Sequence, residues 1–372
     1  MKGAGMITPN LEAVMGKTDS ESIQNAVDYA RRSGQNSVTI PRQNDRTGEA
    51  LWIVDRAIRL PSDMELVLED CHLQMADGVY DNMLVNEHHG TAEGRTAAGT
   101  DRNITVRGIG KAILDGGKYN GLSEKNHSRD GLPHISKNNL LLFTNVDGFS
   151  IRNIACHNQR WWALNFVYCR NGRVSDIDFK ACDIGIDEEG NAYHGLRRDR
   201  YKEVLVKNAD GIDLRQGCHH ITIENITGFT EDDTVALTNL NGSLEKMYCV
   251  EGLSSDIAYV TIRNIRAAAY CTIVRLLNQG ALKLHDIQVS QVQDMSQTCP
   301  YLDHGLFSVR VGDGHHMYGD RNSTAEETYN IALADIDGRG EAVLHLAGEI
   351  GNLTVERITA IGETPLLQDY RS

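Results

Sequence analysis

A short segment of alternating apolar residues recurs along most of the chain, and its spacing constrains the fold more than any other feature. Its eight copies begin at Ile104, Phe149, Gly172, His220, Tyr259, Leu282, Tyr329 and Leu353. Matching isoleucines are 22 or 23 residues apart in three pairs, namely Ile154 and Ile177, Ile265 and Ile287, and Ile336 and Ile358. A period near 22 leaves no room for a helix between the strands, so each turn must pair with the next.

The period therefore predicts an all-β fold, a single-stranded right-handed parallel β-helix in one domain over residues 1–372, with the coil from about 37 to 362. A leucine-rich horseshoe would need a Leu-x-x-Leu-x-Leu signature, and a β-sandwich would show turns about every 8–12 residues. Residues 18–34 predict an amphipathic helix, because Thr18 and Glu21 form a capping box before apolar residues at helical spacing. This helix would cover the open end of the coil.

Composition narrows the partners and the compartment. The formal charge of −14, without a basic run, argues against a nucleic acid or an anionic membrane as a partner. The chain has no apolar stretch of the roughly 20 residues that span a bilayer, and its start lacks the pattern of a secretory signal. Eight cysteines at irregular spacing favour reduced thiols and a cytoplasmic location. Cys249 and Cys271, 22 residues apart, are predicted to stack inside the coil.

Carboxylates are concentrated between Asn208 and Asn239, in a stretch otherwise typical of β-strands. Asp210 and Asp232 are 22 residues apart, so they and Asp233 are expected to converge on the outer surface of adjacent strands, about 4.8 Å apart. Crowded carboxylates cannot all ionise cheaply, and a protonated acid beside ionised ones suits glycoside hydrolysis. Asp213, an odd number of positions from Asp210, is expected to point to the other face in a structural role.

Several motifs resemble glycoside hydrolase family 28, the polygalacturonase group. "NADGID", from Asn208, and "EDDTVAL", from Glu231, resemble the family's NTDGID and GDDCIA signatures. "TIVRLLN", which contains Arg275, resembles its Arg-Ile-Lys strand. Weaker similarities in "ITVRGIGKAILDGG" and "QRWWALNFVYCRNGRVSDI" follow the family's order, so the resemblance covers most of the chain.

The resemblance implies a pectin-lyase-like β-helix and an enzyme that inverts the anomeric centre. On the matching positions, it makes Asp232 the general acid that protonates the leaving oxygen. It makes Asp210 and Asp233 the pair that activates water. Arg275 matches the residue that grips the substrate next to the cleaved bond.

Two positions depart from the family's pattern. Where the family has the histidine of a Gly-His-Gly turn, which tunes the acids, this chain reads "CVEGLSSD", with Glu251 or Ser254 at the expected place. Glu251 is the candidate replacement. Leu277 stands where the family has the lysine that holds a uronate carboxylate. Because leucine cannot pair with a carboxylate, the substrate is predicted not to be polygalacturonate.

Further candidates complete the predicted site. Asn208 and Trp162 are the other expected substrate-binding residues, Trp162 by stacking on a sugar ring. Adjacent tryptophans in a strand point to opposite faces, so at least one of Trp161 and Trp162 is expected in the core. The histidine pairs of "NEHHG" and "GDGHHMYGD" lack the spaced ligand set of a zinc site, and neither a metal nor a cofactor is predicted.

These features together predict a cytoplasmic glycoside hydrolase, exo-acting and inverting, that cleaves a glycosidic bond in an oligosaccharide by paired-aspartate acid–base catalysis. Loops that interrupt the period would rim the groove and enforce exo action. The expected partner is an oligosaccharide or polysaccharide, and nothing indicates the oligomeric state. Two alternatives stay open. A β-helical polysaccharide lyase or sugar epimerase would use the acids to bind Ca²⁺, and a catalytically inactive carbohydrate-binding β-helix would fit the missing histidine.

Overall fold

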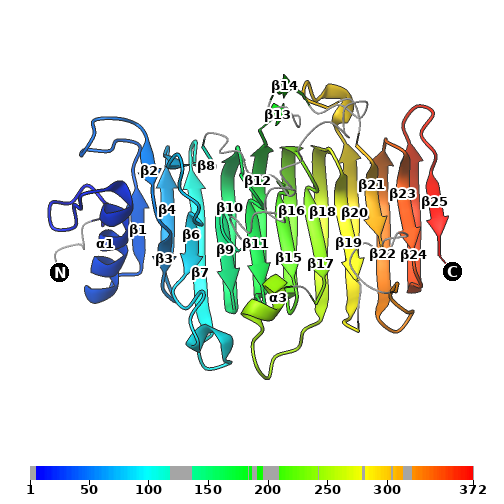
Figure 1. Ribbon diagram of the computed structural model, residues 1–372, viewed down its shortest axis with the longest axis horizontal. Coiled ribbons are helices and arrows are strands. Elements are labelled where there is room, and N and C mark those ends of the chain that lie inside the picture. Colours follow the sequence, from blue (N-terminus) through cyan, green and yellow to red (C-terminus); the bar gives the residue numbers. More distant parts are fainter. Residues whose placement is uncertain are drawn as a thin grey trace.

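The computed structural model describes residues 6–117, 136–182, 184–186, 191–195, 209–241, 243–278, 281–302, 305–312 and 321–371. As predicted, the chain forms a right-handed parallel β-helix. Two long parallel sheets share one axis, which runs from the N-terminus at the left of Figure 1 to the C-terminus at the right. Each turn of the coil contributes to both sheets, so residues a full turn apart lie side by side.

The larger sheet, here called sheet A, has 13 strands among the described residues. In chain order they are β1 (Ser37–Ile40), β2 (Trp52–Val54), β4 (Glu65–Glu69), β5 (His72–Met75), β7 (Asp101–Ile109), β8 (Ile113–Asp115), β10 (Val146–His157), β12 (Arg170–Lys180), β16 (His219–Thr230), β18 (Ile257–Ala269), β20 (Leu284–Asp294), β22 (Thr328–Gly338) and β24 (Gly351–Ala360).

The second sheet, sheet B, has 10 strands in the part of the chain that the structure describes. They are β3 (Ile58–Leu60), β6 (Leu84–Asn86), β9 (Leu141–Thr144), β11 (Leu164–Val167), β15 (Ile212–Arg215), β17 (Val235–Asn239), β19 (Thr272–Asn278), β21 (Phe307–Val311), β23 (Ala342–Ala347) and β25 (Leu367–Tyr370). The remaining elements are α1 (Asp19–Arg32), the antiparallel pair β13 (Ile184–Ile186) and β14 (Ala192–His194), α3 (Ser243–Tyr248), and the 3₁₀ turns η1 (Glu93–Arg95) and η3 (Ser296–Thr298).

The long strands of sheet A turn two corners. In β16, His220 and Asn225 have φ of 56° and 58°, in the left-handed region, which asparagine tolerates better than most residues. The pairing of β16 with β18 places them opposite Tyr259 and Asn264, which are also left-handed. Asn264 Nδ2 donates to Asn225 Oδ1 at 2.8 Å, so the corners form ladders along the axis. Such corners re-aim the strand, and sheet A bends around the core opposite sheet B.

The observed register tests the predicted spacing. Ile154 lies opposite Ile177, and Ile336 lies opposite Ile358, as predicted. The third pair, Ile265 with Ile287, was wrong: Ile287 lies opposite Val260, and Ile265 lies opposite Val292. An apolar residue follows both corners of each strand, and Ile287 follows the first corner whereas Ile265 follows the second.

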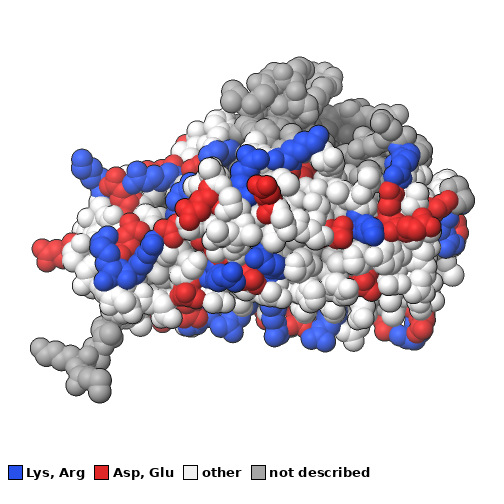
Figure 2. Space-filling view, turned by 90° about the horizontal axis from the view of Figure 1, so that it is seen from below, with Lys and Arg blue, Asp and Glu red and all other residues white. Residues whose placement is uncertain are grey.

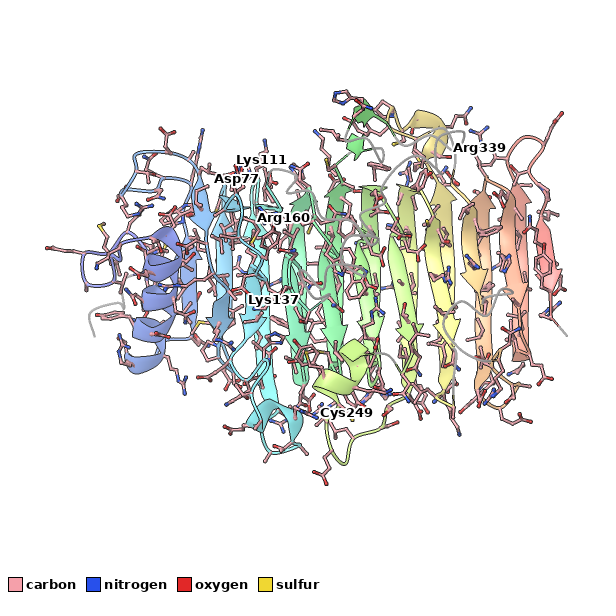
Figure 3. The ribbon with its side chains drawn as sticks, viewed as in Figure 1. Asp77, Lys111, Lys137, Arg160, Cys249 and Arg339 are labelled. Atoms are coloured by element: carbon pink, nitrogen blue, oxygen red, sulfur yellow. The ribbon has the colours of Figure 1, made fainter. Side chains whose placement is uncertain are left out.

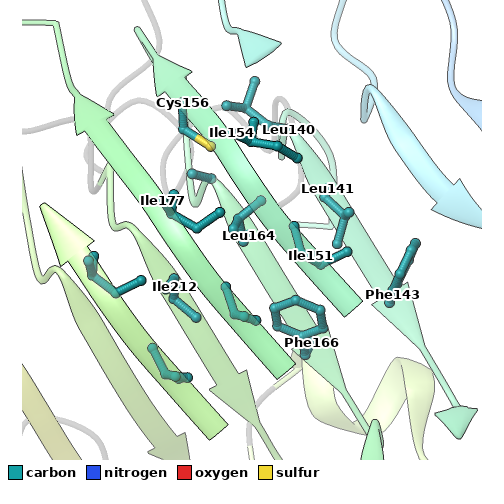
Figure 4. Packing of buried hydrophobic residues seen from close by; sticks show 14 of the residues in the cluster. Leu140, Leu141, Phe143, Ile151, Ile154, Cys156, Leu164, Phe166, Ile177 and Ile212 are labelled. Atoms are coloured by element: carbon teal, nitrogen blue, oxygen red, sulfur yellow. The ribbon is translucent and has the colours of Figure 1, made fainter. Parts of the chain in front are cut away.

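The interior of the coil is a continuous apolar core (Figure 4). Phe149 stacks on Phe166 with ring centroids 4.6 Å apart, and Phe143 meets both rings edge to face. At the N-terminal end, α1 covers the core with Ile23, Ala26, Val27 and Ala30, all fully buried, as the helical spacing predicted. Thr18 Oγ1 accepts a hydrogen bond from the backbone N–H of Glu21 at 3.2 Å and so caps this helix.

The predicted stacking of Cys249 and Cys271 is wrong. Cys249 is exposed on the connection that carries α3 (Figure 3), and Cys271 is half-buried. That connection lengthens this turn of the coil. Ile221 lies opposite Val260, which comes 39 residues later, so residues that are 22 apart do not lie side by side here. The cysteines that do fill the core are Cys71, Cys156, Cys169 and Cys218, and burial raises the pKa of all four thiols.

The surface seen in Figure 2 carries lysine and arginine interspersed with aspartate and glutamate. Because the two signs of charge are mixed, the described residues of this face form no continuous basic patch. None of the helices in the described part of the chain is long and apolar enough to cross a membrane.

Candidate active site

Three aspartates meet where the chain passes from sheet A to sheet B. Asp210 precedes β15, and Asp232 and Asp233 lie between β16 and β17. The strands pair with Ile212 opposite Val235, so the offset is 23 and Asp210 is level with Asp233 rather than with Asp232. Carboxylate oxygens of the three residues, here called the aspartate cluster, lie within 4.8 Å of one another. The structure thus brings together the three residues that the spacing singled out.

Backbone contacts fix the aspartate cluster. The N–H of Asp233 donates to Asp210 Oδ1 at 3.1 Å, and the N–H of Gly211 donates to the carbonyl of Asp233 at 2.9 Å. On the other side, the N–H of Ala209 donates to Glu231 Oε2 at 2.9 Å, which gives this fourth carboxylate a structural role. Asp210 and Asp233 are 4% and 8% exposed, whereas Asp232 is half-buried. Asp232 is therefore the member that a substrate reaches most easily.

Burial and mutual repulsion raise the pKa of carboxyl groups in the aspartate cluster, as predicted. Burial is the main cause that raises the pKa of Asp210 well above its ordinary value, and the charges of Asp213, Asp232 and Asp233 add to it. Burial also raises the pKa of Asp233. Protons are therefore retained in this cluster at a pH where ordinary aspartates are ionised, and a proton donor and acceptors can stand side by side.

Asp213 belongs beside the cluster, contrary to the expectation that it points to the other face. It lies on the outer face of β15, level with Asn165 in β11 and Ala236 in β17, and is fully buried. Asp210 precedes the strand, so the alternation that begins at Ile212 does not extend back to it. Burial raises the pKa of Asp213 to about 7, although the charge of Arg215, 3.1 Å away, acts in the opposite direction.

Two arginines lie on the same outer face, on the C-terminal side of the cluster. Arg275 in β19 lies opposite Arg310 in β21, and they are 8% and 9% exposed. Both charges lower the pKa of Asp233 against the effect of burial. Arg275 was a predicted substrate-binding residue, and the structure places it near the acids. Arg310 was missed, because a long connection between β19 and β21 hides the period that would have aligned "FSVRV" with "TIVRLLN".

The remaining candidates are buried or lie outside the described residues. Trp162 is 3% exposed, and the Arg215 guanidinium lies over its ring, 3.8 Å from the centroid, so the ring is occupied by a cation rather than open to a sugar. Trp161 is 4% exposed, so both tryptophans are buried. Leu277 lies on the outer side of β19, 3% exposed. Asn208 lies outside the described residues.

Glu251 does not meet the aspartate cluster. The acids precede β17, whereas Glu251 follows both β17 and α3, and a five-residue strand spans about 17 Å. Glu251 is exposed, its N–H donates to the carbonyl of Arg95 at 3.1 Å, and it forms a bridge with Thr96. The long connection displaces this residue from the place that a 22-residue period would give it.

A second group of close side chains is formed by Glu87, His88 and Asp101, here called the Asp101 group, at the start of β7. Asp101 is fully buried and accepts from Asn86 Nδ2 at 2.7 Å and from the N–H of His88 at 2.9 Å. Its Oδ1 is 2.8 Å from His88 Nδ1. Both groups have donor atoms close enough to hold a metal ion, although the spacing of the histidines in the sequence did not suggest one.

Comparisons with known proteins identify the family and the fold. The model of glycosyl hydrolases family 28 matches residues 59–269, more than half of the chain. Two similar structures are the exopolygalacturonase of Thermotoga maritima (12% identity, 96% of this chain, 92% of that chain, TM-score 0.57) and the endo-xylogalacturonan hydrolase of Aspergillus tubingensis (13%, 98%, 95%, 0.57). The tailspike of Escherichia coli bacteriophage HK620 shares the fold (14%, 99%, 63%, 0.56).

Identities this low show the fold alone, and no curated protein sequence matches the chain. The family match covers the segments that carry the aspartate cluster and ends at the last residue of β18, before Arg275. This chain belongs to glycosyl hydrolases family 28, and it is a glycoside hydrolase.

Proposed function

We propose that the protein hydrolyses a glycosidic bond with Asp232 as the general acid and with Asp210 and Asp233 as the pair that activates water. The observation that carries this proposal is the aspartate cluster itself, with its carboxylate oxygens within 4.8 Å of one another. Asp232, the half-buried member, would give its proton to the leaving oxygen. The buried pair would take a proton from the water that attacks the anomeric carbon.

The proposed outcome is inversion, on the strength of the family resemblance. Inverting glycosidases separate their carboxyl groups by about 6.5–9.5 Å, to leave room for water. The oxygens of the cluster are closer than that, so Asp232 would swing toward the substrate when it binds. Proton NMR of the first-formed sugar would show the anomer opposite to that of the substrate. Retention would mean that one aspartate attacks the sugar directly.

For the substrate, we propose a neutral oligosaccharide cleaved from its end. Leu277 offers no charge to a uronate, and an unpaired buried carboxylate costs several kcal/mol. A polygalacturonase related by fold acts as an exo-enzyme according to its name, which favours the same mode here. Arg310 is the residue that would supply the missing charge if the substrate were acidic.

Release of reducing ends tests the substrate directly. The wild-type protein would be assayed on a panel of neutral oligosaccharides and on oligogalacturonates at matched concentration, with Asp232→Asn as the control for contaminating enzymes. Turnover of a neutral oligosaccharide and none of oligogalacturonate is the expected result. If the wild type cleaves oligogalacturonate efficiently and Arg310→Met does not, the residue that sets specificity is Arg310 rather than Leu277.

One observation favours a second function, a Ca²⁺-dependent lyase. The three carboxylates of the aspartate cluster could hold a cation, and hard cations prefer oxygen ligands. Activity that vanishes with a chelator and returns with Ca²⁺, with an unsaturated product, would favour the lyase over the hydrolase. Binding of oligosaccharide without turnover would favour an inactive carbohydrate-binding protein.

We also propose a cytoplasmic location. Four cysteines, Cys71, Cys156, Cys169 and Cys218, are thiols buried in the core rather than halves of disulfides, which supports a reducing compartment. Cell fractionation followed by detection of the protein would test this location, and recovery outside the cytoplasm would contradict it.

A further inference from the structure

A buried ion-pair network lies beside the aspartate cluster and has no part in the chemistry described above. Oδ1 of Asp213 is 3.1 Å from Nη2 of Arg215, two residues later on the same face of β15. Nη1 of Arg215 is 3.4 Å from Oε1 of Glu245 in α3. Trp162, which precedes β11, supplies the ring under the guanidinium. Partners from three parts of the chain therefore fix one cation.

The network is dry. Asp213 is fully buried, and Arg215, Glu245 and Trp162 are 6%, 2% and 3% exposed. A guanidinium stacks well on an indole ring, while its fork of N–H donors points outward in the plane of the guanidinium and can reach carboxylates beside the ring. Charges in such a site are weakly screened, so Arg215 acts on the carboxylates near it more strongly than a surface arginine would.

The charges around the cluster divide between two sides. On one side, Arg215 lowers the pKa of Asp210 and of Asp213 against the effects of burial and of the other aspartates. On the other side, Arg275 and Arg310 have that effect on Asp233. The strand neighbours of Asp213, Asn165 and Ala236, are uncharged, and Glu245 faces Arg215 from α3.

We propose that Arg215 positions the water-activating aspartates by anchoring Asp213 beside Asp210. The clamp of Trp162 and Glu245 fixes the guanidinium for this task. The network would thus serve in place of the histidine that the family resemblance leads one to expect and that this chain lacks. The inference rests on the proposed function of Asp210, because a base that accepts a proton from water has to be ionised and correctly placed.

The consequence for catalysis is a displaced pH dependence. Without Arg215, two buried carboxylates would face each other with less positive charge nearby, and one of them would take up a proton. The fraction of enzyme with an ionised base at a given pH would fall. The acidic limb of the profile of kcat/KM against pH would move to higher pH, while KM at the optimum would change less than kcat.

Titration of the carboxyl carbons by ¹³C NMR tests the inference without any substrate. The protein would carry ¹³C-labelled aspartate, and the Asp210 signal would be assigned by its loss in Asp210→Asn. In Arg215→Met, Asp210 should titrate at a higher pH than in the wild type, because a charge that lowers its pKa is removed. An unchanged Asp210 titration would overturn the proposal. The NMR titration does not depend on hydrolysis. A lack of glycosidase activity would therefore contradict the proposed function without affecting this test of Arg215.

Two further variants keep the test decisive. If Arg215→Met does not fold, Arg215→Lys answers the question, because an ammonium group cannot hold the stacked, forked geometry. Its Asp210 should titrate at higher pH than the wild type, and the wild-type value would overturn the proposal. The matched control is Arg263→Met, which removes an arginine paired with Glu224 on sheet A and should leave the Asp210 titration unchanged. A shift of equal size in this control would show that the effect is not specific to Arg215.

Discussion

The aspartate cluster and the Asp101 group contain similar side chains at similar distances, and their surroundings differ. Asp101 accepts hydrogen bonds from a side-chain amide and from a backbone N–H, and it faces an imidazole nitrogen. Glu87 of the same group is paired with Arg31 from α1. In the aspartate cluster, Asp210 instead faces the charges of other carboxylates, which raise its pKa together with burial.

The difference separates a structural acid from a reactive one. Hydrogen-bond donors that surround a buried carboxylate hold it in place and stabilise the fold, because without the carboxylate these buried donors would have no acceptor. Like charges that crowd a buried carboxylate favour proton uptake, which is the property that acid–base catalysis uses. We therefore expect an aspartate-to-asparagine substitution to lower activity in the aspartate cluster and to lower stability in the Asp101 group.

The largest expected effect follows removal of the proposed general acid. Asp232→Asn should lower kcat/KM by about 10²–10⁴-fold, because general acid catalysis contributes that much. The side chain is half-buried, so thermal unfolding followed by circular dichroism should stay close to that of the wild type. A variant with a third or more of the wild-type rate would remove Asp232 from the mechanism.

The corresponding substitution in the Asp101 group should act on stability. Asp101→Asn replaces an acceptor with an amide in a buried site full of donors, at a cost of about 3 kcal/mol in the free energy of unfolding. Urea denaturation would measure that loss, while kcat per folded molecule stays unchanged. A large fall in kcat with normal stability would show that the two groups are not as different as their surroundings indicate.

A pH series sharpens the contrast further. Because the folded-state pKa of Asp213 is raised to about 7, the unfolded chain releases this proton first, and stability should fall as the pH rises from about 4 to about 7. The slope from this one group is at most about 1.4 kcal/mol per pH unit. Asp213→Asn should flatten the decline in urea midpoints over this range. An identical decline in the variant would contradict the assignment of the raised pKa to Asp213.

The smallest expected effect is at the exposed edge of the Asp101 group. Glu87 pairs with Arg31, and their side chains are 33% and 60% exposed. Glu87→Gln should therefore change the free energy of unfolding by less than about 1 kcal/mol, as for other surface pairs, and the change should shrink in high salt. A loss of stability as large as that of Asp101→Asn would mean that Glu87 contributes as much to the free energy of unfolding as Asp101 does.

The regular parts of the fold could be predicted because they obey one period. The strand segments, the helix at residues 19–32 and the pairing of Ile154 with Ile177 all follow from local alternation and from a turn length that two neighbouring coils share. Convergence of the three aspartates was predictable for the same reason. The motifs "NADGID" and "EDDTVAL" lie on consecutive turns without a long insertion between them.

The parts that were missed lie where an insertion or a bend breaks the period. The connection with α3 displaced Glu251 from the acids and Cys249 from the core, and a sequence period cannot measure such a loop. Asp213 was assigned to the wrong face because strand alternation was extended through a bend. Trp162 was expected to stack on a sugar, yet the Arg215 guanidinium from the adjacent turn fills that place, and only three-dimensional packing shows it.

The role of Asp232 as a proton donor is the central claim, and a comparison of leaving groups tests it most directly. Wild-type protein and Asp232→Asn would be assayed on an oligosaccharide, whose departing alcohol needs a proton, and on a dinitrophenyl glycoside of the same sugar, whose phenolate does not. The account predicts a loss of at least about 10²-fold on the oligosaccharide and a much smaller loss on the dinitrophenyl glycoside. Equal losses on both substrates would contradict it, because Asp232 would then act in some way other than by protonating the leaving oxygen.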